Sequence, residues 1–320
     1  MRRAVLVALP LAGCTGAQTP LGPAGDQAAA LGTLFWLCIG VCGFMYVLVL
    51  PGLGWAVVRR GGGTGGDGMG GDGPLGRALW GWGLLIVGGL TVLVVGSFAA
   101  DRTLAAARDR EAMVVRVTAH QWWWRIQYRD QATGRWVETA NELHLPAGRT
   151  ARLELGSADV IHSFWVPNVA GKMDVIPGRA NAIDATPRRV GWFRGQCAEF
   201  CGTQHAHMAF DVKVEAPADF DRWLAHQAAP ATGDATAFTS SQCAGCHAVR
   251  GTPAVARVGP DLTHVGERRS LAAGTLPMGR GAMQGWIAAP QAIKPGTQMP
   301  QVTLTPPQAD AISRYLVALR

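Results

Sequence analysis

Hydrophobic residues in the first third of the chain gather into two long segments with few polar interruptions. One covers about residues 29–49 and the other about residues 79–100. Each is close to the roughly 20 residues with which a helix crosses a bilayer, where every backbone polar group must be paired within the helix. The pattern therefore predicts a two-helix transmembrane hairpin at residues 29–101.

The apolar positions beyond Asp101 come in short runs separated by turn residues. These runs lie at 113–118, 122–128, 141–145, 151–155, 160–164, 190–193 and 209–214. Short strands at such spacing predict a β-sandwich or barrel, which we assign to residues 110–216. A short amphipathic stretch and a proline- and glycine-containing linker at 217–233 separate it from a last domain at 234–320, which ends in a predicted helix at 306–319.

The N-terminus has the layout of an export signal. Two arginines precede an apolar stretch and small residues, and the stretch is shorter than a membrane span. We therefore expect residues 1–13 to be removed. The sequence from Leu11 to Cys14 also resembles the bacterial lipoprotein cleavage box, which predicts a lipidated Cys14 at the start of a mature segment at 14–28. Ordinary signal cleavage nearby is the alternative.

Composition and charge narrow the class of protein. Hydrophobic residues make up 48% of the chain and charged residues only 16%, which favours attachment to membrane lipid. The formal charge of +7 comes without a lysine-rich run or a basic helix, and the arginines are scattered. No nucleic acid is therefore expected as a partner.

The loop between the two apolar segments sets the orientation of the hairpin. Arg59, Arg60 and Arg77 lie close to the helix ends, and the positive-inside bias predicts that this loop is cytoplasmic and that both flanking parts are outside. The glycine run at 61–73 follows no strand and lacks the Gly-Lys-Ser/Thr ending of a phosphate-binding loop. We interpret it as a flexible linker.

Two thiols, an imidazole and a thioether crowd into the twelve residues from Cys197 to Met208. These donors, which include Cys201 and His205, suit copper better than magnesium, calcium or manganese. His162, 35 residues upstream in a β-branched and aromatic run, is expected to be a further ligand at a strand end. Zinc accepts the same Cys2His2 set, so a structural zinc site in a membrane-anchored binding protein is an alternative of a different class.

The last domain begins with a second pair of close cysteines. Cys243, Cys246 and His247 have the Cys-x-x-Cys-His spacing that attaches a c-type haem through two thioethers, with the histidine as an iron ligand. The same short motif is also compatible with zinc. A carbonyl in the following segment, 259–262, is expected to accept a hydrogen bond from the His247 ring and so fix its orientation.

The motif does not determine the ligand opposite His247. Met278, Met283 and Met299 are candidates, because a thioether opposite an imidazole raises the haem potential towards electron transfer. We favour Met299, which lies in an irregular loop ahead of the last helix, whereas Met283 sits in a helical pattern typical of a core. His264 is a further possible ligand, with an exposed loop histidine as the alternative interpretation.

Three adjacent tryptophans follow His120. On a strand, Trp122 and Trp124 would share one face and Trp123 would take the other. Such side chains belong to a core by default. The functional alternative is that one of them lies at the surface as the contact through which electrons enter.

Together these motifs are similar to those of a known family. His162 with the 197–208 loop, the aromatic run at 120–124, residues 174–179 and the hairpin resemble subunit II of haem-copper cytochrome c oxidases. The last domain resembles class I cytochrome c, and the fusion resembles subunit II of bacterial caa3-type oxidases. The resemblance implies a multidomain protein with a transmembrane hairpin, an all-β cupredoxin-like Greek-key barrel and an all-α class I cytochrome c domain.

The resemblance also implies a role for each donor of the loop. It implies a binuclear copper centre, CuA, bridged by Cys197 and Cys201, with His162 and His205 as terminal ligands and Met208 and the backbone carbonyl of Glu199 as weak ligands. The Glu199 carboxylate would also help to hold magnesium at the interface with subunit I, and Trp122 would be the point where electrons enter. His207 is at no ligand position and is expected at the surface.

The implied function is electron input to a proton-pumping terminal oxidase that reduces oxygen to water. The haem on His247 would receive electrons from a soluble or membrane cytochrome c or another donor, and CuA would pass them to a haem in subunit I. Further oxidase subunits and membrane lipid are the other expected partners. The two folded domains are expected on the periplasmic side of a bacterial inner membrane.

The chain has no cluster of membrane histidines for an oxygen-reducing haem-copper site, so that reaction belongs to a partner. The same input module attached to a CuA-containing nitric oxide reductase would use similar ligands and is the nearest alternative. The second membrane helix also departs from many relatives, because Arg77 stands before Trp80 where they carry a glutamate near a proton-uptake route. The resemblance therefore does not extend to proton uptake at this point.

Overall fold

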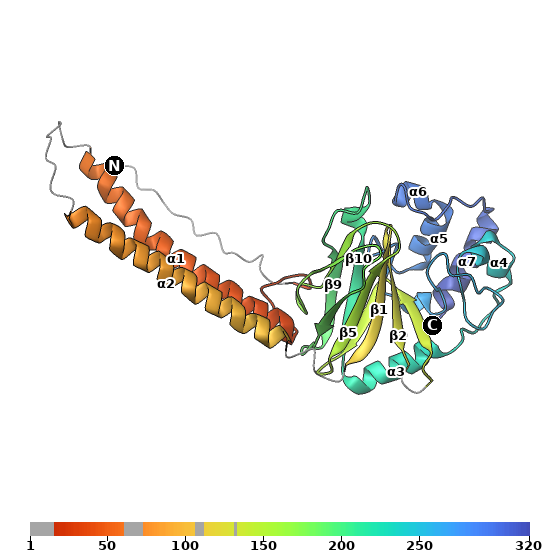
Figure 1. The fold of residues 1–320 in the computed structure, drawn as a ribbon. Coiled ribbons are helices and arrows are strands. Elements are labelled where there is room, and N and C mark those ends of the chain that lie inside the picture. Colours follow the sequence, from red (N-terminus) through yellow and green to blue (C-terminus); the bar gives the residue numbers. More distant parts are fainter. Residues whose placement is uncertain (1–15, 61–72, 106–111, 131–132) are drawn as a thin grey trace. The chain divides into compact units, whose positions relative to one another are not determined.

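A computed structural model of the chain (Figure 1) describes residues 16–60, 73–105, 112–130 and 133–320. Its contacts divide the chain into two compact units, one made of Ala29–Asp109 and the other of Met1–Ala28 and Arg110–Arg320. The predicted export signal at 1–13, the lipidation of Cys14 and residues 61–72 of the glycine run lie outside the described residues.

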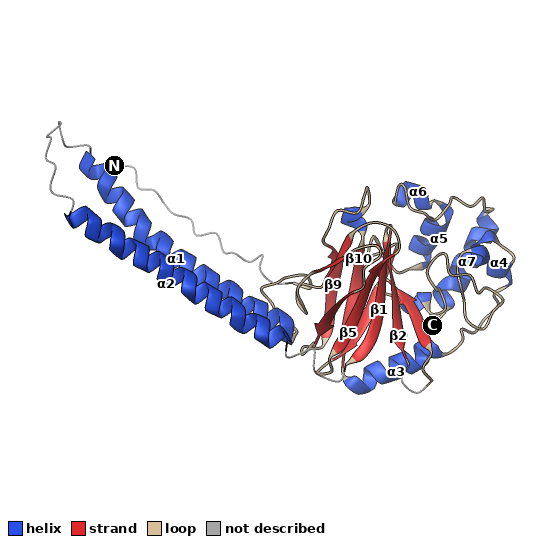
Figure 2. Ribbon diagram, in the orientation of Figure 1, coloured by secondary structure: helices blue, strands red, loops and turns tan. Residues whose placement is uncertain are grey.

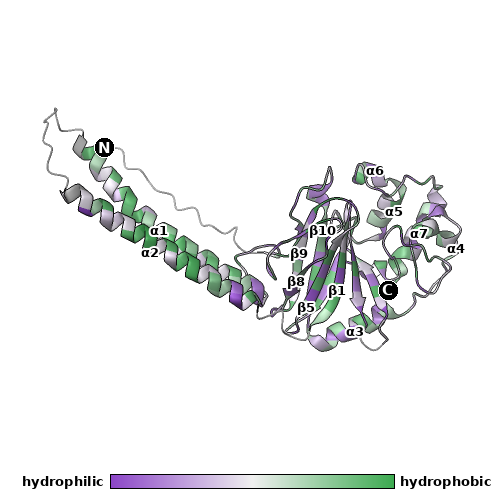
Figure 3. Cartoon of the chain, viewed as in Figure 1, coloured by the Kyte–Doolittle hydropathy of each residue, from purple (hydrophilic) through white to green (hydrophobic). Residues whose placement is uncertain are grey.

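The first unit is built from a pair of helices, α1 (Asp26–Arg60) and α2 (Gly73–Ala105), which confirms both predicted helices. Their apolar stretches, at 26–58 and 76–105, have a mean hydropathy of 2.3 and 2.2 and are long enough to cross a membrane. Figure 3 shows hydrophobic residues along both helices. A Cβ on Gly96 of α2 would clash with the side chain of Leu37 on α1, so glycine there lets the helices approach closely.

The second unit holds two five-stranded sheets, drawn in red in Figure 2, that form the predicted cupredoxin-like barrel. The first sheet has the order β3-β2-β1-β5-β8, with strands at Trp136–Ala140, Trp123–Arg129, Met113–His120, Ala151–Ser157 and Asn181–Ala185. The second has the order β4-β10-β9-β6-β7, with strands at Glu142–Pro146, Ala209–Glu215, Gly191–Cys197, His162–Trp165 and Met173–Val175. Every strand predicted from the sequence is present, with ends shifted by a few residues.

Alternating side chains of the central strands fill the space between the two sheets. Val115 and Val117 of β1 and Trp124 of β2 are fully buried. The rings of Phe164 and Phe210, from β6 and β10, pack edge-on against Trp124 at centroid distances of 5.7 and 5.4 Å. Burial of side chains of this size stabilises the fold by about 1.5–3 kcal/mol each. This core forms a rigid frame around the ends of β6, β9 and β10. The thiols and imidazoles described below project from these ends and from the loop between β9 and β10.

Strands β3, β7 and β8 were not predicted, because the polar residues of β3 and β8 are paired only in the tertiary structure. Glu138 of β3 is buried, and a lone buried carboxylate would be costly. Arg125 of β2 lies 3.1 Å from it. Asp184 of β8 is likewise buried and lies 3.5 Å from Arg152 of β5. Since these partners come from neighbouring strands, the hydrophobic pattern of the segment itself does not indicate a strand.

Trp122 is not on a strand, so the prediction that it shares a strand face with Trp124 is wrong. His120 pairs directly with Trp123 across the β1–β2 hairpin, which leaves Gln121 and Trp122 as the turn. The side chain of Trp122 is nevertheless buried within the barrel core.

Helix α3 (Pro217–Ala228) packs against the barrel and leads into the last domain. Its Phe220 and Trp223 lie against Tyr128 at ring distances of 6.1 and 5.1 Å. The last domain surrounds a second hydrophobic core with short helices, as predicted. Its helices are α4 (Thr236–Thr239), α5 (Arg280–Ala288), α6 (Pro290–Ile293) and α7 (Pro306–Ala318), with 3-10 turns at Gln242–Gly245 and Val265–Glu267 and a two-stranded ladder of β11 (Ser270–Leu271) and β12 (Leu276–Pro277).

Two carboxylates enclose the buried ring of His144, a residue to which the sequence assigned no role. Nδ1 lies 2.8 Å from Glu215 and Nε2 lies 3.0 Å from Glu142, while the ring stacks on Trp223 at 3.8 Å. Burial alone would lower the pKa of His144, but the hydrogen bonds to both carboxylates outweigh it and raise this pKa. A charged imidazolium therefore ties β4, β10 and α3 together.

We expect His144→Leu to destabilise the protein by about 3 kcal/mol, because buried Glu142 then loses its cation and Glu215 keeps only Lys213, 2.6 Å away. The raised pKa of folded His144 means that its stabilising contribution is complete below the unfolded value of about 6.5 and is lost as the pH rises through the folded value. Unfolding in denaturant at mildly acidic and at alkaline pH gives the free energy of unfolding of the unmodified protein and of the variant. The deficit of the variant should shrink at alkaline pH, and an equal deficit at both would contradict the assignment. The control variant is His207→Leu, which replaces an exposed histidine.

Candidate metal and cofactor sites

A cluster of thiols and an imidazole lies where β9 runs into the 198–208 loop. Cys197 ends β9, and Cys201 follows four residues later in the loop. Their Sγ atoms are 3.7 Å apart, and Nδ1 of His162 lies 3.8 Å from Cys197 Sγ. The ligand atoms of these three buried residues all lie within 4.8 Å of one another. They are close enough to bind shared metal ions.

The rest of the loop brings three further donors to the thiols. His205 Nδ1 and Met208 Sδ lie 3.6 and 3.8 Å from Cys201 Sγ. The backbone carbonyl oxygen of Glu199 lies 3.2 Å from Cys197 Sγ. A 3-10 turn at His205–His207 leaves His207 exposed, as predicted. The structure thus gathers all six residues that the sequence had singled out for this site.

This donor set fits a pair of soft metal ions better than one zinc ion. The cluster offers two thiols, two imidazole nitrogens, a thioether and a carbonyl. A structural zinc is almost always four-coordinate and tetrahedral. Thiolate, imidazole and thioether together are the donors that protein copper sites use. The chemistry of the cluster therefore fits two copper ions that share Cys197 and Cys201.

The two thiols are coupled through their short separation. The hydrogen bond with Cys201 lowers the pKa of Cys197 to about 3, although burial opposes this, and His162 lowers it further. The hydrogen bond with Cys197 and burial both raise the pKa of Cys201. The sulfurs therefore retain one proton between them, and binding of metal ions at this position would release it.

Asp159 is a residue of the site that the sequence analysis overlooked. Its Oδ1 lies 2.8 Å from Nε2 of His162, and its Oδ2 accepts a 2.6 Å hydrogen bond from the backbone N–H of Gln121. A carboxylate on one ring nitrogen fixes the tautomer and leaves the other nitrogen, here Nδ1, for a metal ion. The available signal was an acidic residue three positions before the expected ligand.

Trp122 is in direct contact with the same loop. Its Nε1 and the side-chain amide of Gln121 both donate to the carbonyl of Cys201, at 2.9 and 2.8 Å. Gly202 has a φ of +115°, and a Cβ there would lie 2.9 Å from Trp122 Cζ2. Glycine is required at 202 because the backbone approaches the indole so closely. With only 8% of its surface exposed, Trp122 is a buried residue of this chain.

A large cavity in the last domain contains the residues of the Cys-x-x-Cys-His motif. It encloses about 1140 Å³ of space not filled by atoms, part of it open to solvent, and Cys243, Cys246 and His247 line it. The lining also includes Trp122 and Trp123 of the barrel, so the cavity extends to the residues beside the thiol cluster.

The orientation of His247 is fixed by a backbone carbonyl. Its Nδ1 donates to the carbonyl of Pro260, 2.8 Å away, which confirms the hydrogen bond expected from the 259–262 segment and leaves Nε2 for an iron ion. A Cβ on Gly259 would lie 2.6 Å from His247 Cε1, so glycine makes room for the ring. Burial lowers the pKa of His247 and keeps the imidazole neutral, which is the ligating form.

Two of the three candidate methionines line this cavity. Met283, on α5, is buried in the second core, whereas Met299 is half-buried in the loop after α6. Met278 and His264 are not among the described residues that line it. The alternative interpretation of His264 as an exposed loop histidine is wrong: it is buried, and its Nε2 donates to the carbonyl of Ala229 at 3.1 Å, because the chain leaving α3 packs over it.

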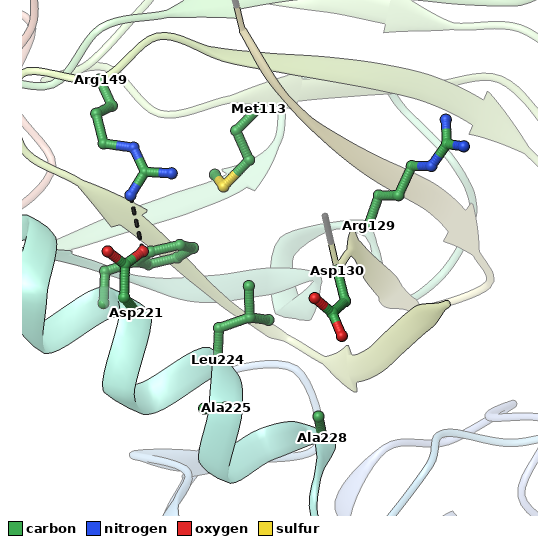
Figure 4. Close-up of a pocket in the computed structure, with 9 residues that line it drawn as sticks. Met113, Arg129, Asp130, Arg149, Asp221, Leu224, Ala225 and Ala228 are labelled. Carbon is green, nitrogen blue, oxygen red and sulfur yellow. Dashed lines mark hydrogen bonds and ion pairs between the residues drawn. The ribbon is translucent and has the colours of Figure 1, made fainter. Parts of the chain in front are cut away.

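Two other features carry less chemistry. A pocket between the barrel and α3 (Figure 4) contains an Arg149–Asp221 ion pair of 2.7 Å, and its described lining residues include neither cysteine nor histidine.

At the junction of α3 with the last domain, ligand atoms of His226, His264 and Glu267 lie within 4.8 Å of one another. There His226 pairs with Glu267 at 3.2 Å, so we interpret the group as an ion pair.

Comparison with protein families divides the chain near the linker at 217–233. The family described as cytochrome c oxidase subunit II, periplasmic domain, matches residues 131–215, and the family described as cytochrome c matches residues 233–320.

Individual relatives match most of the chain. Cytochrome c oxidase subunit 2 of Alkalihalophilus pseudofirmus is 32% identical over 237 residues, which cover 71% of this chain and 67% of the relative. Cytochrome c oxidase subunit 2 of Bacillus sp. (strain PS3) is 33% identical over 257 residues, with 74% and 71% covered. Among solved structures, the periplasmic domain of subunit II of cytochrome oxidase of Bradyrhizobium japonicum is 30% identical with a TM-score of 0.35, and the match covers 37% of this chain and 95% of that one.

Proposed function

This chain belongs to the cytochrome c oxidase subunit II family, and from that membership we propose that it is the subunit through which electrons enter a terminal oxidase. In this proposal a covalent haem in the last domain receives electrons and a copper pair in the barrel takes them over. The observation that carries it is the position of Trp122, which lines the cavity of the Cys-x-x-Cys-His motif and also donates a hydrogen bond to the carbonyl of Cys201 in the thiol cluster.

The copper ligands are assigned from the donors that surround the two thiols. Cys197 and Cys201 would hold the ions together with His162 and His205, and Met208 and the carbonyl of Glu199 would be weaker donors. When bound, such a centre takes up and releases single electrons. The chain's own contribution is rigidity, because Asp159 holds His162 and the barrel core holds both ends of the loop, so little has to move on electron transfer.

The haem ligands are assigned in the same way. Cys243 and Cys246 form the thioether bonds, and His247 and Met299 bind the iron. Met299 is preferred over Met283 because its loop is held by Gln291, whose side-chain amide donates to the carbonyls of Thr297 and Met299 at 2.7 and 2.8 Å. A fixed loop can present a thioether to iron without displacing a core residue.

Trp122 has a different role here from that of a surface contact. Because it is buried and forms part of the cavity lining, a separate donor protein would not reach it. We propose that it connects the haem cavity with Cys201 inside the chain, and that a soluble or membrane cytochrome c, or another donor, delivers electrons at the haem.

The remaining assignments concern the surroundings of the subunit. The two apolar helices anchor it in a bacterial inner membrane, with the folded domains on the periplasmic side, and Cys14 carries lipid. Glu199 is exposed beside the thiol cluster. This supports a role for its carboxylate in binding magnesium against subunit I, the partner that receives the electrons and reduces oxygen.

The test is to purify the intact complex and to measure its copper, zinc and haem content, its optical spectrum, and its consumption of oxygen and of nitric oxide. We expect copper and haem in the chain, the near-infrared absorption of a mixed-valence copper pair, and oxygen uptake. Zinc in the chain, together with the absence of the near-infrared absorption, would refute the copper assignment. Nitric oxide reduction without oxygen uptake would replace the oxidase with the alternative enzyme.

A further inference from the structure

Lys294, the residue after α6, buries its ammonium group among three backbone carbonyls. Only 2% of the residue is exposed. Nζ lies 2.8 Å from the carbonyl oxygen of Trp122, 2.8 Å from that of His207 and 3.0 Å from that of Ala272. Trp122 belongs to the β1–β2 turn, and His207 belongs to the 198–208 loop with the proposed copper ligands, called the copper loop below. Both lie in the barrel, whereas Ala272 belongs to the last domain. One side chain thus joins three segments across the contact between two domains.

The number and arrangement of the acceptors match a lysine ammonium group. An ammonium has three N–H donors, whereas a neutral amine has two and would leave one carbonyl without a donor. Arginine has a planar fork that cannot point at three separate carbonyls around one atom. The chain contains 26 arginines and only 3 lysines, so lysine at this buried position departs from its general use of arginine. Burial lowers the pKa of Lys294 to about 7, a cost that the three acceptors oppose.

The backbone that receives Lys294 is itself held in an unfavourable conformation. Ala272 and Ala273 have φ of 52° and 59°, in the left-handed region that costs a non-glycine residue about 1–2 kcal/mol. The carbonyl of Ala273 accepts a hydrogen bond from the backbone N–H of Ala209 of the barrel, at 3.1 Å, across the domain contact, and that of Ala272 accepts from Lys294 within the last domain. Such strain persists only where surrounding contacts impose it.

The residues after Lys294 continue the same contact. Gln204 of the copper loop donates to the carbonyl of Pro295 at 2.8 Å. Gly296 has a φ of +83°, and a Cβ there would lie 3.6 Å from the Trp122 indole. The loop that begins at Lys294 therefore lies on the copper loop and on Trp122, and five residues later it carries Met299, which lines the haem cavity.

We propose that Lys294 is a positioning residue for internal electron transfer: by binding the carbonyls of Trp122, His207 and Ala272, it fixes the haem cavity against Trp122 and the copper loop. The inference rests on the proposed function, because it assumes that haem and copper occupy the two sites. Lys294 also lines that cavity, but its ammonium group is bound by the three carbonyls. It sets the separation across which an electron moves, and it makes the contact between the two domains a fixed one.

The test is Lys294→Met in the full chain within the purified complex, with Lys172→Met, an exposed lysine, as the matched control. We expect unchanged haem and copper content and unchanged spectra of both centres. After photoreduction of the haem, the rate of electron transfer to copper should fall by roughly tenfold or more, as is typical when a supporting contact of a metal site is lost. The control should keep the rate of the unmodified chain.

A second readout does not depend on the cofactors. Hydrogen exchange at the backbone amides of residues 203–207 and 296–299 should become faster in Lys294→Met and stay unchanged in Lys172→Met. If Lys294→Met does not fold, Lys294→Arg keeps the charge and should show both effects to a smaller extent. Electron transfer and hydrogen exchange that both match the unmodified chain, with both centres loaded, would overturn the proposal. Absence of copper or haem from the unmodified chain would refute the proposed function instead, and hydrogen exchange would still decide the role of Lys294.

Discussion

Cys201→Ser is expected to abolish the copper pair while leaving the haem of the same chain in place. Cys201 is the thiol that contacts most of the other donors, with Cys197, His205 and Met208 all within 3.8 Å of its sulfur. A serine hydroxyl is a hard donor that cannot bridge two copper ions as a thiolate does. Copper content and the near-infrared absorption of the purified complex measure the loss.

Oxygen uptake by the Cys201→Ser complex should fall by more than about 100-fold, since loss even of an outer contact of a metal site costs 10- to 100-fold. The control is Cys42→Ser, which removes an exposed thiol of α1. It should leave copper, haem and oxygen uptake unchanged. A Cys201→Ser complex with a full copper complement and the mixed-valence spectrum would exclude Cys201 as a bridging ligand.

Met299→Leu is expected to lower the reduction potential of the haem while leaving the haem covalently attached. Loss of the thioether removes the ligand that, opposite an imidazole, raises the potential of a c-type haem. Axial ligands tune haem potentials over a range of about 0.8 V, so the shift should be one of the largest that a single residue of this chain can cause. A redox titration of the haem in the purified complex measures it.

The matched control for Met299→Leu is Met283→Leu, because both methionines line the same cavity. Met283 is buried in the core of the last domain, so its replacement should reduce stability modestly, by less than about 1.5 kcal/mol, with little change in potential. The opposite result, a large fall in potential for Met283→Leu and none for Met299→Leu, would assign the iron to the helix methionine.

Much of the fold could be predicted because its signals are local. The two apolar stretches of α1 and α2 and most of the strands have the hydrophobic period of their own element. Strands β3 and β8 were missed because Glu138 and Asp184 are neutralised by arginines of neighbouring strands. Trp122 was assigned to a strand because its sequence neighbours are strand-like. The pairing of His120 with Trp123, a tertiary register, left it in the turn.

Most of the residue types that make the two centres were determined by the sequence alone, because all of the assigned donors except His162 and Met299 lie close together along the chain. Cys197 and Met208 are eleven positions apart, and Cys243 and His247 are four apart, so any fold of those loops keeps the donors near one another. The tertiary structure alone decided which distant groups support them. Asp159 behind His162 and Lys294 at the domain contact are single polar residues, and their effect exists only because the fold brings them partners from distant segments, Gln121 for Asp159 and Trp122 and His207 for buried Lys294.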